Sequence, residues 1–415
     1  MTGPIKCEIA VIGAGVIGLA IAHRLALEGR EVVLIDREPP GMGASYGNAG
    51  TVADYAVQPV GTPSVLAGLP RLLFDRNSPL TIRKAALPAL APWLLRFARQ
   101  CLPAAARHNA LALASLLTDA QPRWAALAAE IGGADLLQHK GCIYLYERVR
   151  ERRAAEADLA FRRSAGVAVE MLGADAIAAL EPGLPPVEGG GAFFPGASFM
   201  IDPGRMVQLL AQAALAEGAG LLRGEVTTIS RGIDGLRLGG PGVQVHARRV
   251  VIAAGAHSRA LALQAGDRVP LDTERGYHVE WDMPAQLLHR PCCPTARGFY
   301  LCPMQGRLRV AGTVELGGLA APPSPHRIAR MVAGARAFFP DLGVPAREWM
   351  GFRPSMPDSL PVIGPSRSGN DLLHAYGHGH IGVTLAPLTA EIIADYLAGR
   401  ESARDFSACH PGRFR

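Results

Sequence analysis

The first 36 residues alternate between short apolar runs and one longer stretch with helical spacing. Residues 7–12 are mainly apolar and predict a buried strand. Residues 16–28 carry apolar side chains at helical spacing and stop at Gly29, and residues 31–35 predict a second buried strand. This order predicts a βαβ unit, in which a helix connects two parallel strands.

The remaining chain repeats these patterns with unrelated segments between them. Residues 39–63 are rich in Gly, Pro, Ser and Asn, which indicates a long functional loop. The spacing predicts helices over 80–130, 151–165, 205–217 and 325–338, and strands over 141–146, 223–229, 250–255, 274–282 and 297–314. Asp202 is expected to cap the helix that begins at Pro203. Residues 360–398 return to strand, glycine loop and helix.

This order predicts an α/β fold, α+β overall, with one discontinuous domain. We expect a Rossmann-like nucleotide-binding domain made of residues 1–80, 190–260 and 345–415. Residues 81–189 and 261–344 are expected to form an interleaved substrate domain, or cap, built on an antiparallel sheet.

Composition narrows the class of protein. Of 415 residues, 49% are hydrophobic and 19% charged, which excludes a disordered chain. The net charge is +6, but without a run of five like charges and with only 6% aromatic residues a nucleic-acid partner is not expected. Seven scattered cysteines without a C-x-x-C pair indicate reduced thiols rather than disulfides or zinc. We recognise neither a signal peptide nor an apolar run of about 18 residues, and therefore expect a cytoplasmic protein without a transmembrane segment.

Glycine is enriched, at 48 residues, and its first cluster has a recognisable spacing. The segment Gly13-Ala14-Gly15-Val16-Ile17-Gly18 follows the first strand and opens the first helix. These glycines allow a tight turn, close approach of a pyrophosphate and packing of helix on strand. Asp36 ends the next strand, where a carboxylate binds a ribose hydroxyl. The motif predicts a dinucleotide and leaves NAD and FAD both open.

A second loop of small residues, 41–51, suits a chain wrapped against a flat cofactor. From this loop onward the sequence resembles the superfamily of FAD-dependent D-amino acid oxidases and dehydrogenases, closest to the bacterial D-amino acid dehydrogenases. The resemblance rests on the Ser–Asn–Gly loop and on three later segments, which are Arg249–Ser258, Asp358–Gly364 and Tyr376–Thr384. It implies that the discontinuous domain binds FAD.

The motifs and the resemblance together assign a set of residues to the cofactor. The set is Gly13, Ala14, Gly15, Val16, Ile17, Gly18, Asp36, Arg37, Ala44, Ser45, Asn48, Ala49, Gly50, Val226, Ala254, Gly255, Gly379, His380, Ile381, Gly382, Val383 and Thr384. The helix that begins near Gly382 would aim its positive end at the flavin ring. Some relatives bind flavin through a cysteine near residues 352–356, but this chain has none between Cys302 and Cys409, which predicts non-covalent FAD.

The resemblance also points to a substrate site. Arg353 matches the arginine that grips the substrate carboxylate, for which only a guanidinium offers a planar fork. Tyr300 matches an active-site tyrosine, and Tyr277 is a weaker candidate on an alternating strand. His380 is a further candidate for the pocket wall. We do not expect His378 and His380 to bind a metal ion, because no third ligand cluster accompanies them.

These residues imply oxidative deamination of a D-amino or imino acid, with hydride transfer from Cα to flavin N5. The resemblance implies electron transfer to an acceptor in the membrane, such as a quinone, rather than to oxygen. Residues 87–102 carry an apolar stripe with Arg96 and Arg99 on another face, which fits either a helix on the inner face of the membrane or an ordinary core-facing helix. An oxygen-using oxidase of glycine, sarcosine or a D-amino acid, and an NAD-dependent Rossmann dehydrogenase, remain alternatives.

Overall fold

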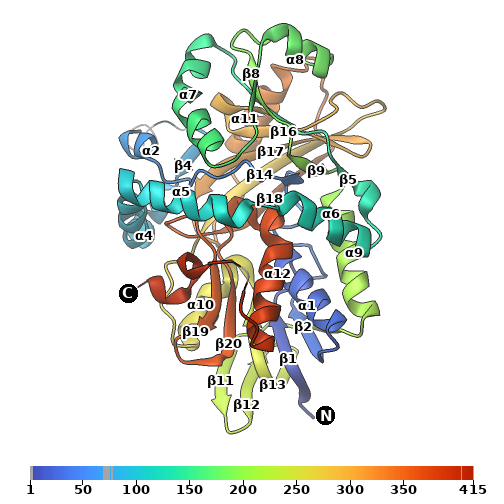
Figure 1. Ribbon diagram of the computed structural model, residues 1–415, viewed down its shortest axis with the longest axis vertical. Coiled ribbons are helices and arrows are strands. Elements are labelled where there is room, and N and C mark those ends of the chain that lie inside the picture. Colours follow the sequence, from blue (N-terminus) through green and yellow to red (C-terminus); the bar gives the residue numbers. More distant parts are fainter. Residues whose placement is uncertain (1–2, 69–74, 76–77, 403, 415) are drawn as a thin grey trace.

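The computed structural model describes residues 3–68, 75, 78–402 and 404–414, and places two large sheets at opposite ends of the long axis (Figure 1). The predicted βαβ unit is confirmed as β1 (Ile5–Ile12), α1 (Val16–Leu27) and β2 (Val32–Asp36). Strands β1 and β2 are parallel, with Ile9 opposite Val32. The chain therefore begins with the nucleotide-binding unit that its pattern predicts.

The first sheet recruits its other strands from distant parts of the chain. Its parallel core has the order β10-β2-β1-β13-β20, as expected for a discontinuous Rossmann-like domain. The added strands are β10 (Gly220–Arg223), β13 (Val243–Ile252) and β20 (Gly369–Tyr376), with β11 (Thr228–Gly232), β12 (Gly235–Gly240) and β19 (Val362–Ser366) pairing antiparallel beside them.

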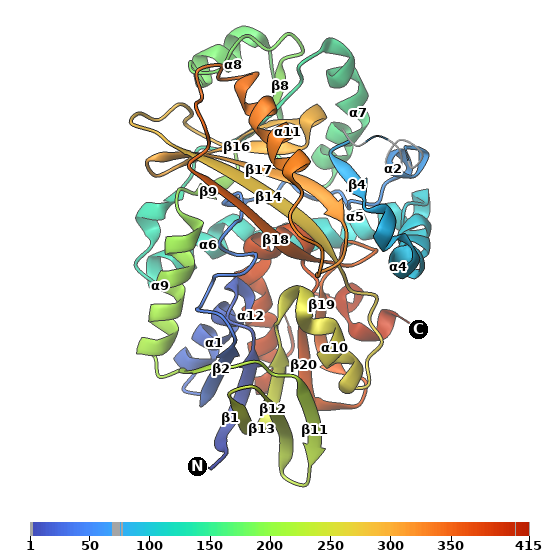
Figure 2. The same ribbon diagram turned by 180° about the vertical axis from the view of Figure 1, so that it is seen from behind.

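The second sheet is mostly antiparallel. Its centre is β14 (Asp272–Asp282), which pairs with β17 (Arg307–Leu316) on one side and β18 (Arg347–Ser355) on the other. The remaining strands are β4 (Leu80–Ile82), β6 (Cys142–Leu145), β7 (Glu170–Leu172), β8 (Gly191–Phe194), β15 (Cys292–Pro294) and β16 (Phe299–Met304). Helix α11 (Pro325–Arg336) crosses one face of this sheet (Figure 2). Three short strands, β3 (Thr51–Val52), β5 (Leu137–Gln138) and β9 (Ser198–Met200), form a small third sheet.

Two segments lie elsewhere than the predicted domain bounds suggest. Helices α5 (Pro103–Leu117) and α6 (Ala120–Glu130) fall inside the range 81–189 assigned to the substrate domain, yet they pack on the last helix of the first domain, α12 (Gly382–Ala398). Trp124 of α6 donates its indole N–H to the carbonyl of Val383 at 2.7 Å. Conversely, β18 falls inside the range 345–415 assigned to the first domain but is a strand of the second sheet.

Helix α12 is the core helix of the first domain. The segment Gly379–Ala398 has the length and hydropathy of a membrane span, but 72% of its most apolar 18-residue window is buried inside the protein. It packs against α1, α5 and α6, so its apolar surface is already covered. Among the described residues, the other α-helices are α2 (Pro63–Ala67), α4 (Leu87–Gln100), α7 (Val149–Ser164), α8 (Ala174–Leu180), α9 (Pro203–Ala216) and α10 (Ser258–Gln264).

The stripe on α4 faces inward. Leu90, Trp93 and Phe97 are buried with the following Cys101 in a cluster that also contains Leu316. Arg96 and Arg99 are exposed. Of the two interpretations of residues 87–102, the structure therefore supports a helix that packs on the core. Its apolar stripe is covered by the protein and is not available to a membrane.

Candidate active site

A cavity of about 830 Å³ lies where the carboxyl ends of the parallel strands meet the second sheet. Its floor includes the ends of β1, β2, β13 and β20, which is where ligands bind in open parallel sheets. Its roof includes residues of β14, β16, β17 and β18. The cavity is thus bounded by both domains, and residues assigned to the cofactor and to the substrate both line it.

The end of the cavity at α1 is built for a pyrophosphate. The first turn of α1 contains no acidic side chain, and its cap residue Gly15 offers no side-chain partner to the free N–H groups. Gly13 has φ of +109°, and a Cβ there would come within 2.4 Å of the carbonyl oxygen of Ala253. Only glycine fits this turn, which brings the positive end of the helix to the cavity, where it favours an anion.

Asp36 closes the next turn at the end of β2. Its carboxylate accepts hydrogen bonds from the backbone N–H groups of Ala14 at 2.7 Å and Glu38 at 2.9 Å. Beside it, Arg37 contacts Glu225 at 3.2 Å and His257 at 2.9 Å. All of these residues border the cavity. The set provides a carboxylate for ribose hydroxyls and fits the nucleoside half of a dinucleotide.

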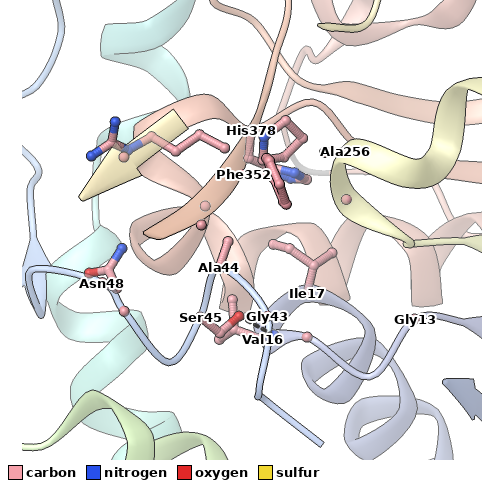
Figure 3. A pocket seen from close by; sticks show the side chains of 18 of the residues that line it. Gly13, Val16, Ile17, Gly43, Ala44, Ser45, Asn48, Ala256, Phe352 and His378 are labelled. Atoms are coloured by element: carbon pink, nitrogen blue, oxygen red, sulfur yellow. Dashed lines mark hydrogen bonds between the residues drawn. The ribbon is translucent and has the colours of Figure 1, made fainter. Parts of the chain in front are cut away.

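The loop 41–51 forms the side of the cavity. Ala44 and Ser45 lie close to the first turn of α1, Asn48 lies farther along the loop, and Phe352 and His378 lie across the pocket from Ser45 (Figure 3). The hydroxyl of Ser45 accepts a hydrogen bond from the N–H of Val16 at 3.0 Å. The loop is therefore joined directly to the helix terminus that would receive the pyrophosphate.

The second sheet holds this loop in place. Arg309 of β17 is fully buried and donates to the carbonyl oxygens of Tyr46 at 3.2 Å and Asn48 at 2.5 Å. Its Nε donates to Glu280 at 2.7 Å, and this ion pair lowers the pKa of Glu280 to about 2 despite the opposing effect of burial. A buried ion pair thus anchors the loop that borders the cofactor cavity.

Arg353 projects from β18 into the cavity from the roof. Its Nη1 donates to the carbonyl oxygen of Thr313 at 2.9 Å. Thr313 has φ of +55°, a strained conformation for a β-branched residue. A Cβ on Gly276 would lie 2.4 Å from Cζ of Arg353, so the guanidinium rests on glycine backbone. These contacts fix the guanidinium where it can offer a fork to a carboxylate.

Tyr300 lies in a cluster of phenols on the same wall. Its hydroxyl is 3.2 Å from that of Tyr144 and 3.4 Å from that of Tyr55. Burial raises the pKa of Tyr300 well above its ordinary value, so the phenol is neutral and available as a hydrogen-bond donor. Tyr300 and Tyr144 both border the cavity.

Tyr277 also borders the cavity, but its hydroxyl is already engaged. It donates to Glu315 at 2.6 Å and accepts from the N–H of Ser324 at 3.1 Å. Between the two tyrosines, the contacts therefore leave Tyr300 better placed for a substrate.

The two loop histidines differ in position. His378 is buried and its Nε2 lies 3.0 Å from the hydroxyl of Thr389, while burial lowers its pKa to about 3. His380 is exposed to the cavity. Among the described residues, no group of three or more His, Cys, Asp and Glu side chains is placed to hold a metal ion.

Most of the residues assigned to the cofactor from sequence border this one cavity; the exceptions are Gly18, Gly50, Ile381 and Thr384. Gly18 instead lets α1 approach the preceding turn, since a Cβ there would come within 1.9 Å of the carbonyl oxygen of Gly13. Gly50 has φ of +77° and approaches the backbone of Met200.

The other two residues that do not border the cavity, Ile381 and Thr384, also contribute to the packing around it. Ile381 is buried in the core of the first domain. The hydroxyl of Thr384 accepts a hydrogen bond from the N–H of Ala53 at 3.0 Å, which ties the start of α12 to the chain after the 41–51 loop.

Sequence reasoning missed several cavity residues. Glu274 and Gly276 of β14, Trp349 and Phe352 of β18, and Tyr144 of β6 all border it. Alternation along β14 could have drawn attention to Glu274 and Gly276, because they share a face of one strand. Nothing in the sequence alone brings Tyr144 of β6 to the same cavity as β18.

Comparison with known proteins agrees with this architecture. The sequence model of the family described as "FAD dependent oxidoreductase" matches residues 8–396. A D-amino-acid oxidase of Bradyrhizobium diazoefficiens is 35% identical, over 98% of this chain and 99% of its own. A D-amino acid dehydrogenase of Rhizorhabdus wittichii is 30% identical, over 95% of this chain and 97% of its own.

Solved structures show the same fold. Glycine oxidase from Geobacillus kaustophilus superposes with a TM-score of 0.80 at 26% identity, over 99% of this chain and 100% of its own. L-proline dehydrogenase from P. horikoshii, at 20% identity, has a TM-score of 0.74. With the dinucleotide cradle, the 41–51 loop and a family match over almost the whole chain, the protein belongs to the FAD-dependent oxidoreductase family and is an FAD-dependent enzyme.

Proposed function

We propose that the protein catalyses oxidative deamination of a D-amino or imino acid. The observation that carries this proposal is the position of Arg353, a guanidinium that borders the same cavity as the FAD-binding motifs. The D-amino acid oxidase and dehydrogenases among its relatives support the D configuration.

The chain supplies positioning rather than a strong base. Arg353 would bind the substrate carboxylate through two N–H groups, and the neutral phenol of Tyr300 would donate a further hydrogen bond. Bound FAD, held non-covalently, supplies the acceptor for hydride from Cα. Fixing the carboxylate at one end leaves the Cα–H little freedom, which is the contribution that oriented binding makes to rate.

We propose that electrons then pass to a non-oxygen acceptor such as a membrane quinone, from a cytoplasmic enzyme at the inner face. The dehydrogenases among the relatives support this choice. The oxidase at 35% identity makes oxygen the second candidate. Because the stripe on α4 is buried, any membrane contact would have to use another surface.

The test is anaerobic mixing of the purified protein with each D- and L-amino acid while the flavin absorbance is followed. Bleaching by D-amino acids is expected, and bleaching by none contradicts the proposal. Repeating the assay in air, with and without an artificial electron dye, separates a dehydrogenase from an oxidase. The Arg353→Ala variant should retain the flavin spectrum and lose substrate affinity, and an unchanged rate of bleaching would speak against the assigned role.

A further inference from the structure

A carboxylate stands beside Arg353 in the same cavity. Glu274 of β14 lies opposite Arg353 of β18 in the antiparallel register, and both border the cavity. Glu274 is only 4% exposed. Side chains at opposite positions on neighbouring strands are close, so the carboxylate of Glu274 and the guanidinium of Arg353 can contact the same ligand.

The two side chains do not neutralise each other as an ion pair. Within the described residues Glu274 forms no ion pair within 4.0 Å, whereas the guanidinium of Arg353 donates to the carbonyl oxygen of Thr313 and lies against Gly276. Burial raises the pKa of Glu274, while the charge of Arg353 and a hydrogen bond from Ser355 oppose that rise. A buried carboxylate without an ion-pair partner is costly, and a positively charged ligand group would reduce that cost.

An amino acid carries one negative and one positive charge, which match the guanidinium of Arg353 and the carboxylate of Glu274. Its carboxylate and its ammonium group are attached to the same carbon, so a ligand carboxylate on Arg353 brings the ammonium within a few ångströms of it. A ligand that carries a carboxylate alone would also place negative charge near Glu274, without a ligand cation to offset that repulsion. The pair Arg353 and Glu274 is therefore complementary to a zwitterion and unfavourable to a simple carboxylic acid.

We propose that Glu274 binds the α-ammonium group of the substrate and makes the site selective for amino acids over 2-hydroxy acids of the same shape. This inference rests on the proposed function, because it takes Arg353 as the carboxylate ligand. It adds a residue that decides which substituent on Cα is accepted.

The test uses two ligands that lack a Cα–H and cannot be oxidised, 2-aminoisobutyrate and 2-hydroxyisobutyrate. They share one carbon skeleton and are achiral, so only the ammonium group differs. Dissociation constants are measured on the FAD-loaded protein from the shift in flavin absorbance. The wild type should bind the amino compound more tightly. Glu274→Gln should weaken that binding by about tenfold or more, as expected for a hydrogen bond to a charged group, and should leave the hydroxy compound unchanged or tighter.

Asp272→Asn is the matched control, since it makes the same chemical change two residues away on β14, beside Arg259 at 4.0 Å. It should alter neither constant. Glu274→Asp keeps the charge and should fall between the wild type and Glu274→Gln. The inference is overturned if the wild type does not prefer the amino compound, or if Glu274→Gln changes both constants by the same factor. If D-amino acids still bleach the flavin in that case, the proposed function survives and only the role of Glu274 is lost.

Discussion

The guanidinium of Arg353 rests on the backbone of Gly276. A Cβ on Gly276 would lie 2.4 Å from Cζ, 2.5 Å from Nη2 and 2.7 Å from Nη1 of Arg353. Gly276 does not have a positive φ, so alanine there meets no backbone strain. The glycine is therefore required by the arginine beside it and not by the strand.

Gly276→Ala should raise the substrate KM strongly with little effect on folding. The added methyl group meets the far end of a flexible side chain, which can move at low cost but then leaves its position in the site. A misplacement of about 1 Å can reduce kcat/KM on the order of 100-fold. Steady-state kinetics with a D-amino acid, together with the flavin spectrum, provide the measurement.

Gly343→Ala is the control for this substitution, because a Cβ at Gly343 meets nothing within 4 Å. Its kinetics should match the wild type. If Gly276→Ala also left KM unchanged, the position of Arg353 would not matter to substrate binding.

Gly47→Ala should weaken FAD binding. A Cβ on Gly47 would lie 2.1 Å from Cζ3 of Trp349, and the ring cannot retreat because it also covers Gly351 and stacks on His278 at 5.1 Å. The 41–51 loop would have to move instead. Overpacking of this kind costs about 1–3 kcal/mol, or roughly tenfold in the FAD dissociation constant for each 1.4 kcal/mol.

The measurement is titration of the apoprotein with FAD. The double variant Gly47→Ala with Trp349→Phe removes part of the indole and should recover part of the affinity. Equal FAD affinity in the wild type and Gly47→Ala would show that the loop does not depend on this contact.

Local signals in the sequence predicted the first domain well. The carboxylate of Asp202 accepts a hydrogen bond from the N–H of Arg205 at 2.9 Å, as expected of the predicted cap. Helix α1 begins at the predicted Val16 and ends one residue before the predicted limit. These features depend on residues within one turn or one strand, so spacing and residue type are sufficient to locate them.

The roof of the cavity could not be predicted in the same way. Glu274 and Arg353 are 79 positions apart in the chain, and only the register of β14 with β18 brings them together. The sequence predicted a strand over 274–282 but none over 347–355, so it could not indicate that β14 and β18 pair. For the same reason the predicted bounds separated β18 from its sheet and assigned α5 and α6 to the wrong neighbours, since tertiary packing and not local pattern decides these contacts.

Arg309→Met should loosen the 41–51 loop and lower stability. Arg309 is the buried link between Glu280 and the carbonyl oxygens of Tyr46 and Asn48. Leaving a buried charge without a partner costs on the order of 3 kcal/mol, and we expect a smaller loss here because Arg307 at 3.2 Å and Arg347 at 3.0 Å still pair with Glu280. Thermal unfolding and FAD titration should both report the change, and the exposed Arg248 offers Arg248→Met as a control.

Adding Glu280→Gln to Arg309→Met should lower the stability further, because Glu280 also pairs with Arg307 at 3.2 Å and with Arg347 at 3.0 Å. FAD affinity should remain low in this double variant, since the carbonyl oxygens of the loop still lack their donor. Full recovery of FAD affinity would contradict an anchoring role for Arg309.

The stability of the protein should fall as the pH drops from about 6.5 towards 4, through His278 among other groups. Burial and the charge of Arg309 lower the pKa of His278 from 6.5 to about 4, although its contact with the carbonyl of Gly47 opposes the shift. The folded state keeps this imidazole neutral while the unfolded chain takes up a proton. The contribution is therefore complete above pH 6.5, is lost as the pH falls, and levels off below pH 4.

His278→Gln removes the titrating group and keeps an N–H donor for Gly47. In urea unfolding between pH 7 and 4.5, the wild type should lose up to about 1.4 kcal/mol per pH unit more than this variant. Glu280, whose pKa is held at about 2, adds a separate loss only below its ordinary value of 4.5, so the two groups act mainly in different pH windows. Parallel curves for the wild type and His278→Gln would mean that His278 is protonated equally in the folded and unfolded states, and the neutral stack of His278 on Trp349 would then be excluded.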